Sequence, residues 1–549
     1  MAKVSFKSNN QGQTVLFPAS LEDKIPQDSP ARLINQIVDG LDISEIIAGY
    51  KGGGNSSYHP RMMLKVILYA YLNNIYSCRK IEKALEDRVS FMWLSGDQVP
   101  DHNTINRFRS LNLKKTIHSI FTQVVIMLVE MGYLSLDVAY FDGTKIESRA
   151  NRYTFVWRKS VEKNKLKLEA KIRKILELIE EGIAQDNDPN DDPPAPINSE
   201  ELKQRIAELN GENRTKEEQK AIKTLENKYL PKLEEYEHHL KILGDRNSYS
   251  KTDPTATFMR MKEDHMRNGQ LKPAYNVQIS TENQFITHYD FFPNPTDTLT
   301  YIPFITGLES RYNRMPKKNV GDAGYGSEEN YEFMESHHIE PYVKYNYFHK
   351  EQKRSFKKNA FLVQNLYYNP EKDYFVCPMG QHMLRVGNTT RTTAGGYKSQ
   401  ITIYQATNCA NCPLRCLCHN AQGNRQIQVN HNLNRHKEHV RELLCSEEGI
   451  MHRKKRPIEP EAVFGQIKAN KQYNRFRHFM QDLLMMDFAI FAIAFNVLKA
   501  HRMTKNKSKN EYNKHENGYY SIVQIIKTNF YKIESQKEKI NSNHQKIAA

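Results

Sequence analysis

The sequence predicts an α/β protein: a sheet-containing core that is preceded by an all-α N-terminal domain and interrupted by two inserts. Three observations support this fold class. Apolar residues recur at helical spacing through residues 20–130. Short apolar strands follow at 138–141 and again within 274–292. Between them, residues 161–245 carry apolar side chains spaced by threes and fours, as in a coiled coil.

The size and charge of the chain indicate how many domains it has and which kinds of partner it binds. Its 549 residues suit three or four domains, and a composition of 39% hydrophobic and 26% charged residues is globular. The formal charge of +16 favours polyanionic partners, most simply nucleic acid, because Lys and Arg neutralise phosphates and release counterions. Charge alone does not separate DNA from RNA or from an acidic membrane surface.

Neither a secretory signal nor a membrane span is predicted. The N-terminus is polar and lacks an apolar signal segment. The apolar stretch that begins at Leu483 is interrupted by Asp487 and Asn496, so we expect a buried core helix. We therefore expect a cytoplasmic protein with no membrane partner. Seven cysteines in such a chain favour metal binding or inert thiols over a disulfide framework.

Residues 1–130 form the predicted N-terminal domain. Asp101 is a good N-cap residue, and the helix that it would begin carries Arg107 and Arg109. A small helical module whose last helix is basic is suited to docking on DNA. The alternative is a helical bundle whose solvated face is basic, and this segment alone does not separate the two.

The rest of the chain changes character several times. The acidic, proline-rich stretch 186–199 cannot be helical throughout, so we expect a helical hairpin around it. The cysteine-rich part is expected to be irregular, and the last 49 residues hold ten Lys and Arg against four Glu. The predicted segments are 131–160 (first part of the core), 161–250 (helical, coiled-coil-like insert), 251–345 (core continued), 346–430 (cysteine-rich insert), 431–503 (C-terminal core helices) and 504–549 (basic tail).

Three acidic residues are candidate catalytic groups. Asp142 and Asp322 each close a short apolar strand and precede a small residue, and such strand ends can bring distant carboxylates together on one sheet edge. Glu461 lies early in a predicted helix, with Lys468 two turns later on the same face. Glu459 is a nearby competitor for the third position. For any one of these acids alone, a cap, a turn or a surface ion pair is the alternative.

Three converging carboxylates can hold two divalent cations, one of which activates a hydroxyl while the other stabilises the leaving oxygen of a phosphodiester. Mg²⁺ suits such a site because it prefers oxygen ligands and keeps several waters. Cations flank the candidate carboxylates in the sequence, including Lys145 and Arg158 after the first aspartate and Arg456 before the glutamate. We expect these side chains to hold a polyanion over the site.

The chain resembles bacterial insertion-sequence transposases of the DDE class over roughly residues 15–500. AYFDGTKIE is similar to the family's first-aspartate strand, GDAGYGSEENYEFM to the second, and EAVFGQIKANKQYNRF to the glutamate helix with its lysine. The stretch LNNIYSCRKIEKALEDRVSFMWLSGDQVPDHNTINRFR is similar to the helical N-terminal domain. Glu461, not Glu459, stands in the E-x-x-F-G context with a lysine seven residues later.

The resemblance implies a ribonuclease H-like mixed sheet with flanking helices, Mg²⁺-dependent nicking and strand transfer by the freed 3′-hydroxyl. Asp142, Asp322 and Glu461 would be the metal ligands, and Lys468 would contact DNA near the cut. The implied partners are double-stranded DNA, as terminal inverted repeats and target, and a second copy of the chain in a synaptic homodimer. The place implied is the bacterial cytoplasm, at the nucleoid when bound to DNA. Some relatives carry an arginine four residues before the glutamate; here that residue is Pro457, so a hairpin-forming mechanism is not assigned.

A cysteine cluster predicts a small zinc-ribbon-like insert. The spacing Cys409-x₂-Cys412 is typical of zinc knuckles, and four thiolates around Zn²⁺ would fold a segment that is poor in core residues. We expect Cys377, Cys409, Cys412 and Cys418 as ligands of a structural zinc ion; the C-x₂-C-x₅-C pattern of similar transposases selects Cys418 over Cys416. The alternative is a set of reduced, inert thiols.

These observations together predict an active DNA transposase. One alternative is a catalytically inactive DNA-binding relative that acts as a repressor or structural DNA binder. Another is a nuclease of the same fold. The presence of all three carboxylates favours the first reading, and the large inserts speak against a minimal nuclease.

Overall fold

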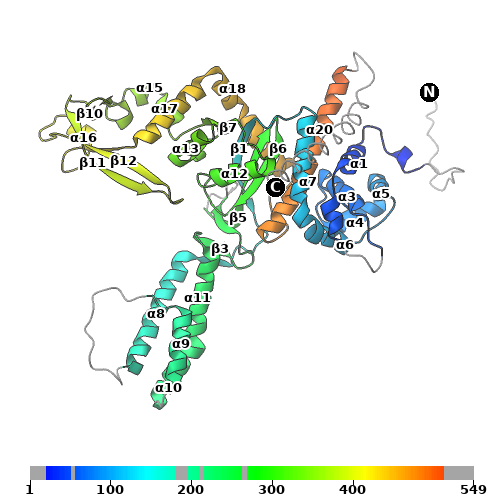
Figure 1. Ribbon diagram of the computed structural model, residues 1–549, viewed down its shortest axis with the longest axis horizontal. Coiled ribbons are helices and arrows are strands. Elements are labelled where there is room, and N and C mark those ends of the chain that lie inside the picture. Colours follow the sequence, from blue (N-terminus) through cyan, green and yellow to red (C-terminus); the bar gives the residue numbers. More distant parts are fainter. Residues whose placement is uncertain (1–19, 51–55, 181–195, 211–214, 262–268, 512–549) are drawn as a thin grey trace, which may run out of the picture. The chain divides into compact units, whose positions relative to one another are not determined.

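The structure, a computed structural model, describes residues 20–50, 56–180, 196–210, 215–261 and 269–511 (Figure 1). The chain forms two compact units. One contains Met1–Ser135 and Met485–Ala549, and the other contains Leu136–Leu484. The predicted basic tail, 504–549, lies from residue 512 onward outside the described residues.

The first unit is helical. Its helices begin at the caps that the sequence offers: the Ser29 side chain accepts a hydrogen bond from the Ala31 N–H, and Asp101 accepts one from the Thr104 N–H at 2.6 Å. Figure 1 shows these helices, in blue and cyan, beside α20, in orange. They are η1 (Glu22–Lys24), α1 (Pro30–Gly40), α2 (Ser44–Ala48), α3 (Pro60–Leu72), α4 (Cys78–Asp87), α5 (Val89–Ser95), α6 (His102–Arg107), η2 (Phe108–Leu113), α7 (Lys114–Glu130) and α20 (Gln481–Glu511).

Helix α20 carries the apolar stretch seen in the sequence. Its part Gln481–Lys505 has a mean hydropathy of 1.8 and is long and apolar enough to cross a membrane, by length and composition only. Because 78% of its apolar window is buried inside the protein, it has the environment of a core helix. Most of it belongs to the helical unit, whereas the sequence placed it in the α/β core; the buried Asp487 binds Tyr71 and Arg109 there.

The second unit is built on a mixed sheet with the strand order β4-β5-β1-β7-β8, in which β6 also pairs with β5. β1 is antiparallel to β5 but parallel to β7, and β7 is parallel to β8. The carboxyl ends of β1 and β7 therefore lie at the same edge of the sheet. The strands are β1 (Val138–Glu147), β4 (Thr257–Arg260), β5 (Leu271–Glu282), β6 (Phe285–Phe292), β7 (Lys318–Gly321) and β8 (Glu340–Val343).

A hydrophobic core joins this sheet to four helices. In β1, the ring of Phe141 packs against Tyr301 and Tyr325, with ring centroids 5.3 and 4.7 Å away. A Cβ atom on Gly321 would lie 2.6 Å from the Phe141 ring, so only glycine fits at the end of β7. The four helices are α12 (Tyr301–Tyr312), α13 (Glu328–Ser336), α14 (Phe348–Glu351) and α17 (His431–Cys445), and α17 is followed by α18 (Glu447–Lys455).

The coiled-coil-like stretch forms more helices than the predicted hairpin. The two ends of this helical insert are joined by a two-stranded antiparallel ribbon, in which β2 (Phe155–Trp157) pairs with β3 (Ser248–Ser250). The apolar stripes predicted from the sequence meet in a common core. Part of the proline-rich linker, 181–195, lies outside the described residues. The helices are α8 (Arg158–Glu180), α9 (Ser199–Asn210), α10 (Lys216–Thr224), η3 (Leu225–Tyr229) and α11 (Leu230–Leu243).

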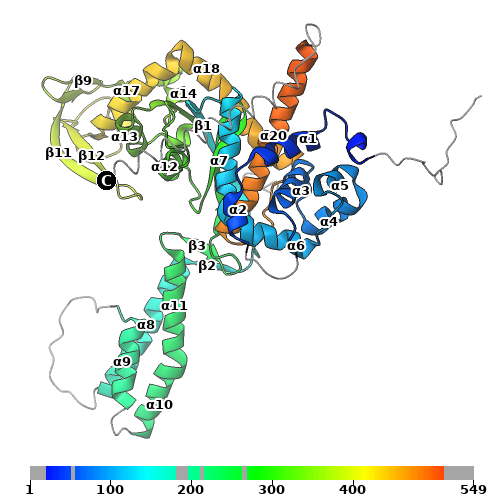
Figure 2. The ribbon, with the colours of Figure 1, turned by 45° about the vertical axis from the view of Figure 1, so that its right-hand side comes forward.

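The cysteine-rich part is more regular than expected, since it contains a five-stranded antiparallel sheet of order β13-β12-β11-β10-β9. Figure 2 shows β11 and β12 as a long hairpin. Alternation of buried and exposed residues is clear only in the short β13, which is why the pattern is weak in the sequence. The strands are β9 (Tyr367–Asn369), β10 (Tyr374–Val376), β11 (His382–Thr392), β12 (Lys398–Ala406) and β13 (Gln426–Val429).

Candidate active site

Asp142 lies within β1, which continues to Glu147 through its pairing with β5, and not at the end of the strand as predicted. Its side chain is almost buried. One of its carboxylate oxygens accepts the N–H of Gly143 at 2.9 Å. A Cβ atom on Gly143 would lie 2.2 Å from Nε2 of Gln278 and 2.6 Å from a carboxylate oxygen of Asp297. The small residue after the aspartate is therefore required by the close approach of these two side chains, one from β5 and one from the loop between β6 and α12.

Asp322 follows β7 directly and caps the short helix η4 (Ala323–Tyr325), where its carboxylate accepts the N–H of Gly324 at 2.8 Å. Glu461 closes the π-helical turn η6 (Pro457–Glu461), which continues α18 and leads into α19 (Ala462–Gly465) and η7 (Gln466–Asn470). Both side chains are partly exposed, 40% and 49%, so solvent and ligands can reach them.

The three carboxylates meet around one guanidinium group. Arg456 Nη2 lies 3.3 Å from Oδ1 of Asp142 and 3.6 Å from Oδ2 of Asp322. Its Nη1 donates a hydrogen bond to Oε1 of Glu461 at 2.5 Å. Three residues that together span more than three hundred positions of the chain thus share one nearly buried cation. Three carboxylates and one guanidinium leave two negative charges, so the site favours further cations.

Glu459, the competing glutamate, has a different environment. Its carboxylate accepts hydrogen bonds from the Gln284 N–H at 2.7 Å and from the Thr281 hydroxyl at 3.2 Å. These partners belong to β5 and the turn that leads into β6, and Glu459 is buried there. Within η6, therefore, Glu459 holds a turn of the sheet while Glu461 is the glutamate that contacts Arg456.

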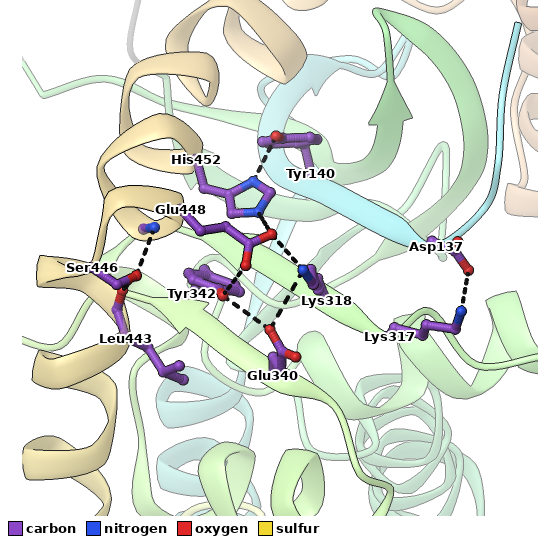
Figure 3. A network of polar contacts seen from close by, with 11 residues as sticks. Asp137, Tyr140, Lys317, Lys318, Glu340, Tyr342, Leu443, Ser446, Glu448 and His452 are labelled. Carbon is purple, nitrogen blue, oxygen red and sulfur yellow. Dashed lines mark hydrogen bonds and ion pairs between the residues drawn. The ribbon is translucent and has the colours of Figure 1, made fainter.

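A polar network holds α18, and with it Arg456, on the sheet (Figure 3). His452 is buried; its Nδ1 lies 2.7 Å from the Tyr140 hydroxyl and its Nε2 lies 3.4 Å from Glu448. Glu448 in turn accepts hydrogen bonds from Tyr342 and Lys318. The network thus ties α18 to β1, β7 and β8. Sequence reasoning missed it, and the only signal was the i,i+4 spacing of Glu448 and His452.

Acidification should loosen this anchor. Burial lowers the pKa of His452, although Glu448 opposes the shift. Below about pH 6.5 the unfolded chain binds a proton at His452 that the folded chain excludes. The free energy of unfolding therefore decreases as the pH is lowered. We expect His452→Gln, which cannot titrate, to lose less thermal stability than the parent between about pH 7.5 and about pH 5.5. Equal losses in both proteins would show that His452 does not carry the effect.

The predicted DNA-contacting cations occupy several places. Lys468 in η7 donates to the Lys145 carbonyl at 3.2 Å, and the Lys145 ammonium donates to the Arg260 carbonyl at 2.9 Å. Both therefore lie along β1 beyond Asp142. Arg158 lies at the base of the helical insert, where it binds the Arg246 carbonyl and Glu162.

The two arginines of the N-terminal unit differ. Arg107 is exposed on α6, as a phosphate contact requires. Arg109 is only 4% exposed, and its guanidinium donates to the Tyr71 hydroxyl at 2.8 Å and lies 4.0 Å from Asp487. The structure therefore does not agree with the expectation that Arg109 contacts DNA, because its charge is already paired inside the helical unit.

Four cysteines line one small cavity of about 20 Å³: Cys377, Cys409, Cys412 and Cys418. Arg425 is buried beside them and donates to the Cys418 sulfur at 3.1 Å. Among the described residues, no group of three or more His, Cys, Asp or Glu side chains is placed to hold a metal ion. The zinc site therefore stays a prediction, which rests on the shared cavity and the spacing.

Zinc removal tests this prediction. If zinc is bound, a chelator that removes it but spares Mg²⁺ should make residues 370–420 sensitive to protease, because the local hydrophobic core is small. Cys412→Ser should lose the metal, whereas Cys416→Ser should keep it, since Cys416 is exposed and does not line the cavity. Purified protein without zinc, and with unchanged protease resistance after chelation, would identify the four cysteines as plain thiols.

The carboxylate cluster offers oxygen donors only. Its donors are carboxylate oxygens, which Mg²⁺ prefers, and two of the three side chains are open to solvent. The Arg456 guanidinium lies between the three carboxylates. The donor chemistry therefore suits a hard divalent cation, but among the described residues the three carboxylates are gathered around the arginine and are not placed to hold a metal ion. The magnesium site stays a prediction.

Two protein-family models match the chain. A Transposase domain (DUF772) matches residues 19–111, which belong to the helical unit, and a Transposase DDE domain matches residues 376–501, which include Glu461. Asp142 and Asp322 lie outside both matched ranges. A comparison with curated proteins found no match. The two family matches, one toward each end of the chain, identify the protein as a DDE transposase of the insertion-sequence type.

Proposed function

We propose that this transposase nicks the ends of a mobile DNA element and joins the freed 3′-hydroxyl ends to target DNA, with Asp142, Asp322 and Glu461 as its catalytic carboxylates. The observation that carries the proposal is the meeting of these three side chains around the Arg456 guanidinium. Scattered surface acids would not share one cation.

The topology of the sheet supports a ribonuclease H-like core. Strands β1, β5 and β6 are successive antiparallel neighbours, and the short β4 also pairs with β5. On the other side of β1, β7 is parallel to β1 and β8 is parallel to β7. Asp142 lies on the central strand and Asp322 at the end of the next parallel strand. The two aspartates therefore come from neighbouring parallel strands of one sheet.

Asp142, Asp322 and Glu461 would hold the divalent cations. Bound Mg²⁺ supplies activation of the attacking hydroxyl and stabilisation of the leaving oxygen. The chain itself fixes the ligands: β1 pairing and burial hold the first, the η4 cap holds the second, and the anchored α18 places the third. Arg456 is a fixed planar cation between them and can bind a phosphate once other cations balance the carboxylates.

DNA is held by cations on the same unit and on the helical unit. Lys145, Arg158, Arg456 and Lys468 are the proposed contacts on the α/β unit, and Arg107 is the one on the helical unit. Joining two element ends requires both to be held at once, so we propose that two copies of the chain act together. Double-stranded DNA is the partner, as element ends and as target.

The test uses a supercoiled donor plasmid that carries the inverted repeats flanking the coding region. With Mg²⁺, the full chain should nick the plasmid at the repeat ends and then produce joined molecules. Binding to the ends without nicking would instead identify an inactive DNA-binding relative. Cutting without regard to sequence would identify a general nuclease, and either result would overturn the proposed function.

A further inference from the structure

A basic segment, residues 344–358, follows β8 beside the carboxylate cluster. It holds six Lys and Arg against one Glu, a net charge of +5. It contains the short helices α14 (Phe348–Glu351) and α15 (Arg354–Lys357). None of these residues entered the predicted DNA contacts. Its cations are Lys344, Lys350, Lys353, Arg354, Lys357 and Lys358, with His349 among them.

The segment starts at the candidate active site. A Cβ atom on Gly326, four residues after Asp322, would lie 2.4 Å from the Lys344 carbonyl oxygen, so the two backbones touch. Burial lowers the pKa of Lys344, the guanidinium groups of Arg456 and Arg453 lower it further, and Asp322 and Glu461 oppose the shift. Lys344, the first cation of the segment, is therefore close enough to Asp322 and Glu461 to interact with them electrostatically.

Helices α17 and α18 place further cations beside residues 344–358. The Arg453 guanidinium lies 5.5 Å from the ring centre of Phe348, and the Lys437 ammonium lies 5.6 Å from that of Tyr345. The one acid of the segment, Glu351, is engaged: it accepts hydrogen bonds from the Tyr345 hydroxyl at 2.8 Å and from Arg441 at 3.2 Å. The cations of residues 344–358 therefore extend away from the carboxylate cluster, and the one carboxylate of the segment is already bound by Tyr345 and Arg441.

The outer part of the segment is exposed. Lys350, Lys353, Arg354, Lys357 and Lys358 are all open to solvent. In the part of the chain that the structure describes, none of these five side chains forms an ion pair with a carboxylate. A cleft of about 370 Å³ runs beside them between α14–α15 and α17, lined in part by Gln352, Lys357, Gln364, Asn365 and Arg441. Five unpaired cations close together repel one another and call for an anionic partner.

Tyr347 gives this surface an aromatic group. Its side chain is 58% exposed, and its backbone is left-handed with φ 75°, a conformation that is costly for a bulky residue. The Lys350 ammonium lies 4.9 Å from the centre of its ring. An exposed ring with a cation beside it matches the way in which proteins bind single strands, since bases stack on the aromatic group while cations hold the phosphates.

We propose that residues 344–358 bind the DNA strand that leaves the carboxylate cluster, with its phosphates on the exposed cations of α14 and α15 and an unpaired base stacked on Tyr347. The inference rests on the proposed function and adds to it the path of the strand and a stacking residue. It predicts that a DNA end with a single-stranded overhang binds better than a blunt end.

Binding can be measured without cleavage. The probes are a fluorescein-labelled duplex with a 3′ overhang and a blunt duplex of the same sequence, in buffer without divalent cations. Replacing Lys353, Lys357 and Lys358 together by Ala should weaken binding about tenfold or more at low salt, and should lower the slope of log affinity against log salt by about 2 to 3. The matched control replaces Lys216, Lys220 and Lys223 by Ala, three exposed lysines of α10. Full-length protein is used throughout.

Stacking of a base on Tyr347 is tested separately, by the preference for the overhang and by the fluorescence of a base analogue. Tyr347→Ala should lose the preference for the overhang by about fivefold or more, and Tyr347→Phe should keep it. Tyr347→Gly removes the ring without the left-handed strain, so it tests the ring even if the alanine variant folds poorly. A 2-aminopurine base in the overhang should be quenched by the parent and by Tyr347→Phe but not by Tyr347→Gly.

Two results would overturn the inference: the triple lysine variant of the segment binding like its α10 control, or an overhang preference that survives Tyr347→Gly. Neither depends on cutting. If the parent cuts element ends while these variants bind normally, only this inference fails. If the parent binds overhangs through Tyr347 but nicks nothing, the binding surface stands and the proposed catalysis fails.

Discussion

Asp142→Asn abolishes nicking of the donor plasmid, a loss of about 10³-fold or more, and leaves binding to element-end DNA unchanged. The amide keeps the size of the side chain but removes one of the charges that cations in this site need. Asp142 also contacts Arg456, so the variant weakens the shared ion pair. Nicking is read on gels and end binding by fluorescence anisotropy, with thermal unfolding as a check of the fold.

The matched comparisons use the other acids of the site. Asp322→Asn and Glu461→Gln should behave like Asp142→Asn, because their carboxylates meet at the same guanidinium. Glu459→Gln should nick DNA at close to the parent rate and lose thermal stability instead, since Glu459 holds the turn at Gln284. Loss of end binding in Asp142→Asn would mean that the aspartate supports the fold, and loss of nicking in Glu459→Gln alone would move the third ligand to that residue.

Asp487→Leu destabilises the helical unit by about 3–5 kcal/mol, because it leaves the buried Arg109 guanidinium without its carboxylate. Asp487 is 1% exposed and also accepts the Tyr71 hydroxyl. The double change Arg109→Met with Asp487→Leu should recover most of the loss, since two apolar side chains then replace the buried charges. Urea unfolding with hydrogen exchange in α3 and α20 measures the effect in this unit.

The control is the exposed ion pair of the same unit. Lys505 and Asp28 lie 2.6 Å apart with both side chains about half exposed, so Asp28→Asn should change stability little. If Asp487→Leu were as harmless as Asp28→Asn, the Tyr71–Arg109–Asp487 contacts would not support the unit. If the double variant stayed as unstable as Asp487→Leu, the loss would come from packing and not from the stranded charge.

Local sequence was sufficient for several features. The apolar run before Asp142 predicted a buried strand, and that strand is present, because backbone pairing and burial both act on neighbouring residues. Its predicted end at Asp142 was wrong, since pairing with β5 carries the strand on to Glu147. The Asp101 cap is present as predicted, since capping involves only the next few residues. Membership of the DDE transposases followed from motifs in a fixed order, and the family matches confirm it.

Other features depend on contacts between distant segments. Periodicity could not show that Arg109 is buried, because its partners Tyr71 and Asp487 come from elsewhere in the chain. The same holds for the assignment of α20 to the helical unit and for the antiparallel sheet formed by a cysteine-rich stretch that was expected to be irregular. Strand pairing and helix packing there join residues whose own neighbours give weak signals.

The amino-acid sequence alone determined the family of this protein, the helical character of its N-terminal region and the identity of the three acids to consider. Only the tertiary structure decided that those acids share the Arg456 guanidinium, that Glu459 is occupied elsewhere, and that the cations after β8 start beside Asp322. The reason is physical: propensity, capping and burial patterns act over a few residues, whereas an electrostatic site is made by charges that approach one another only after the chain has folded.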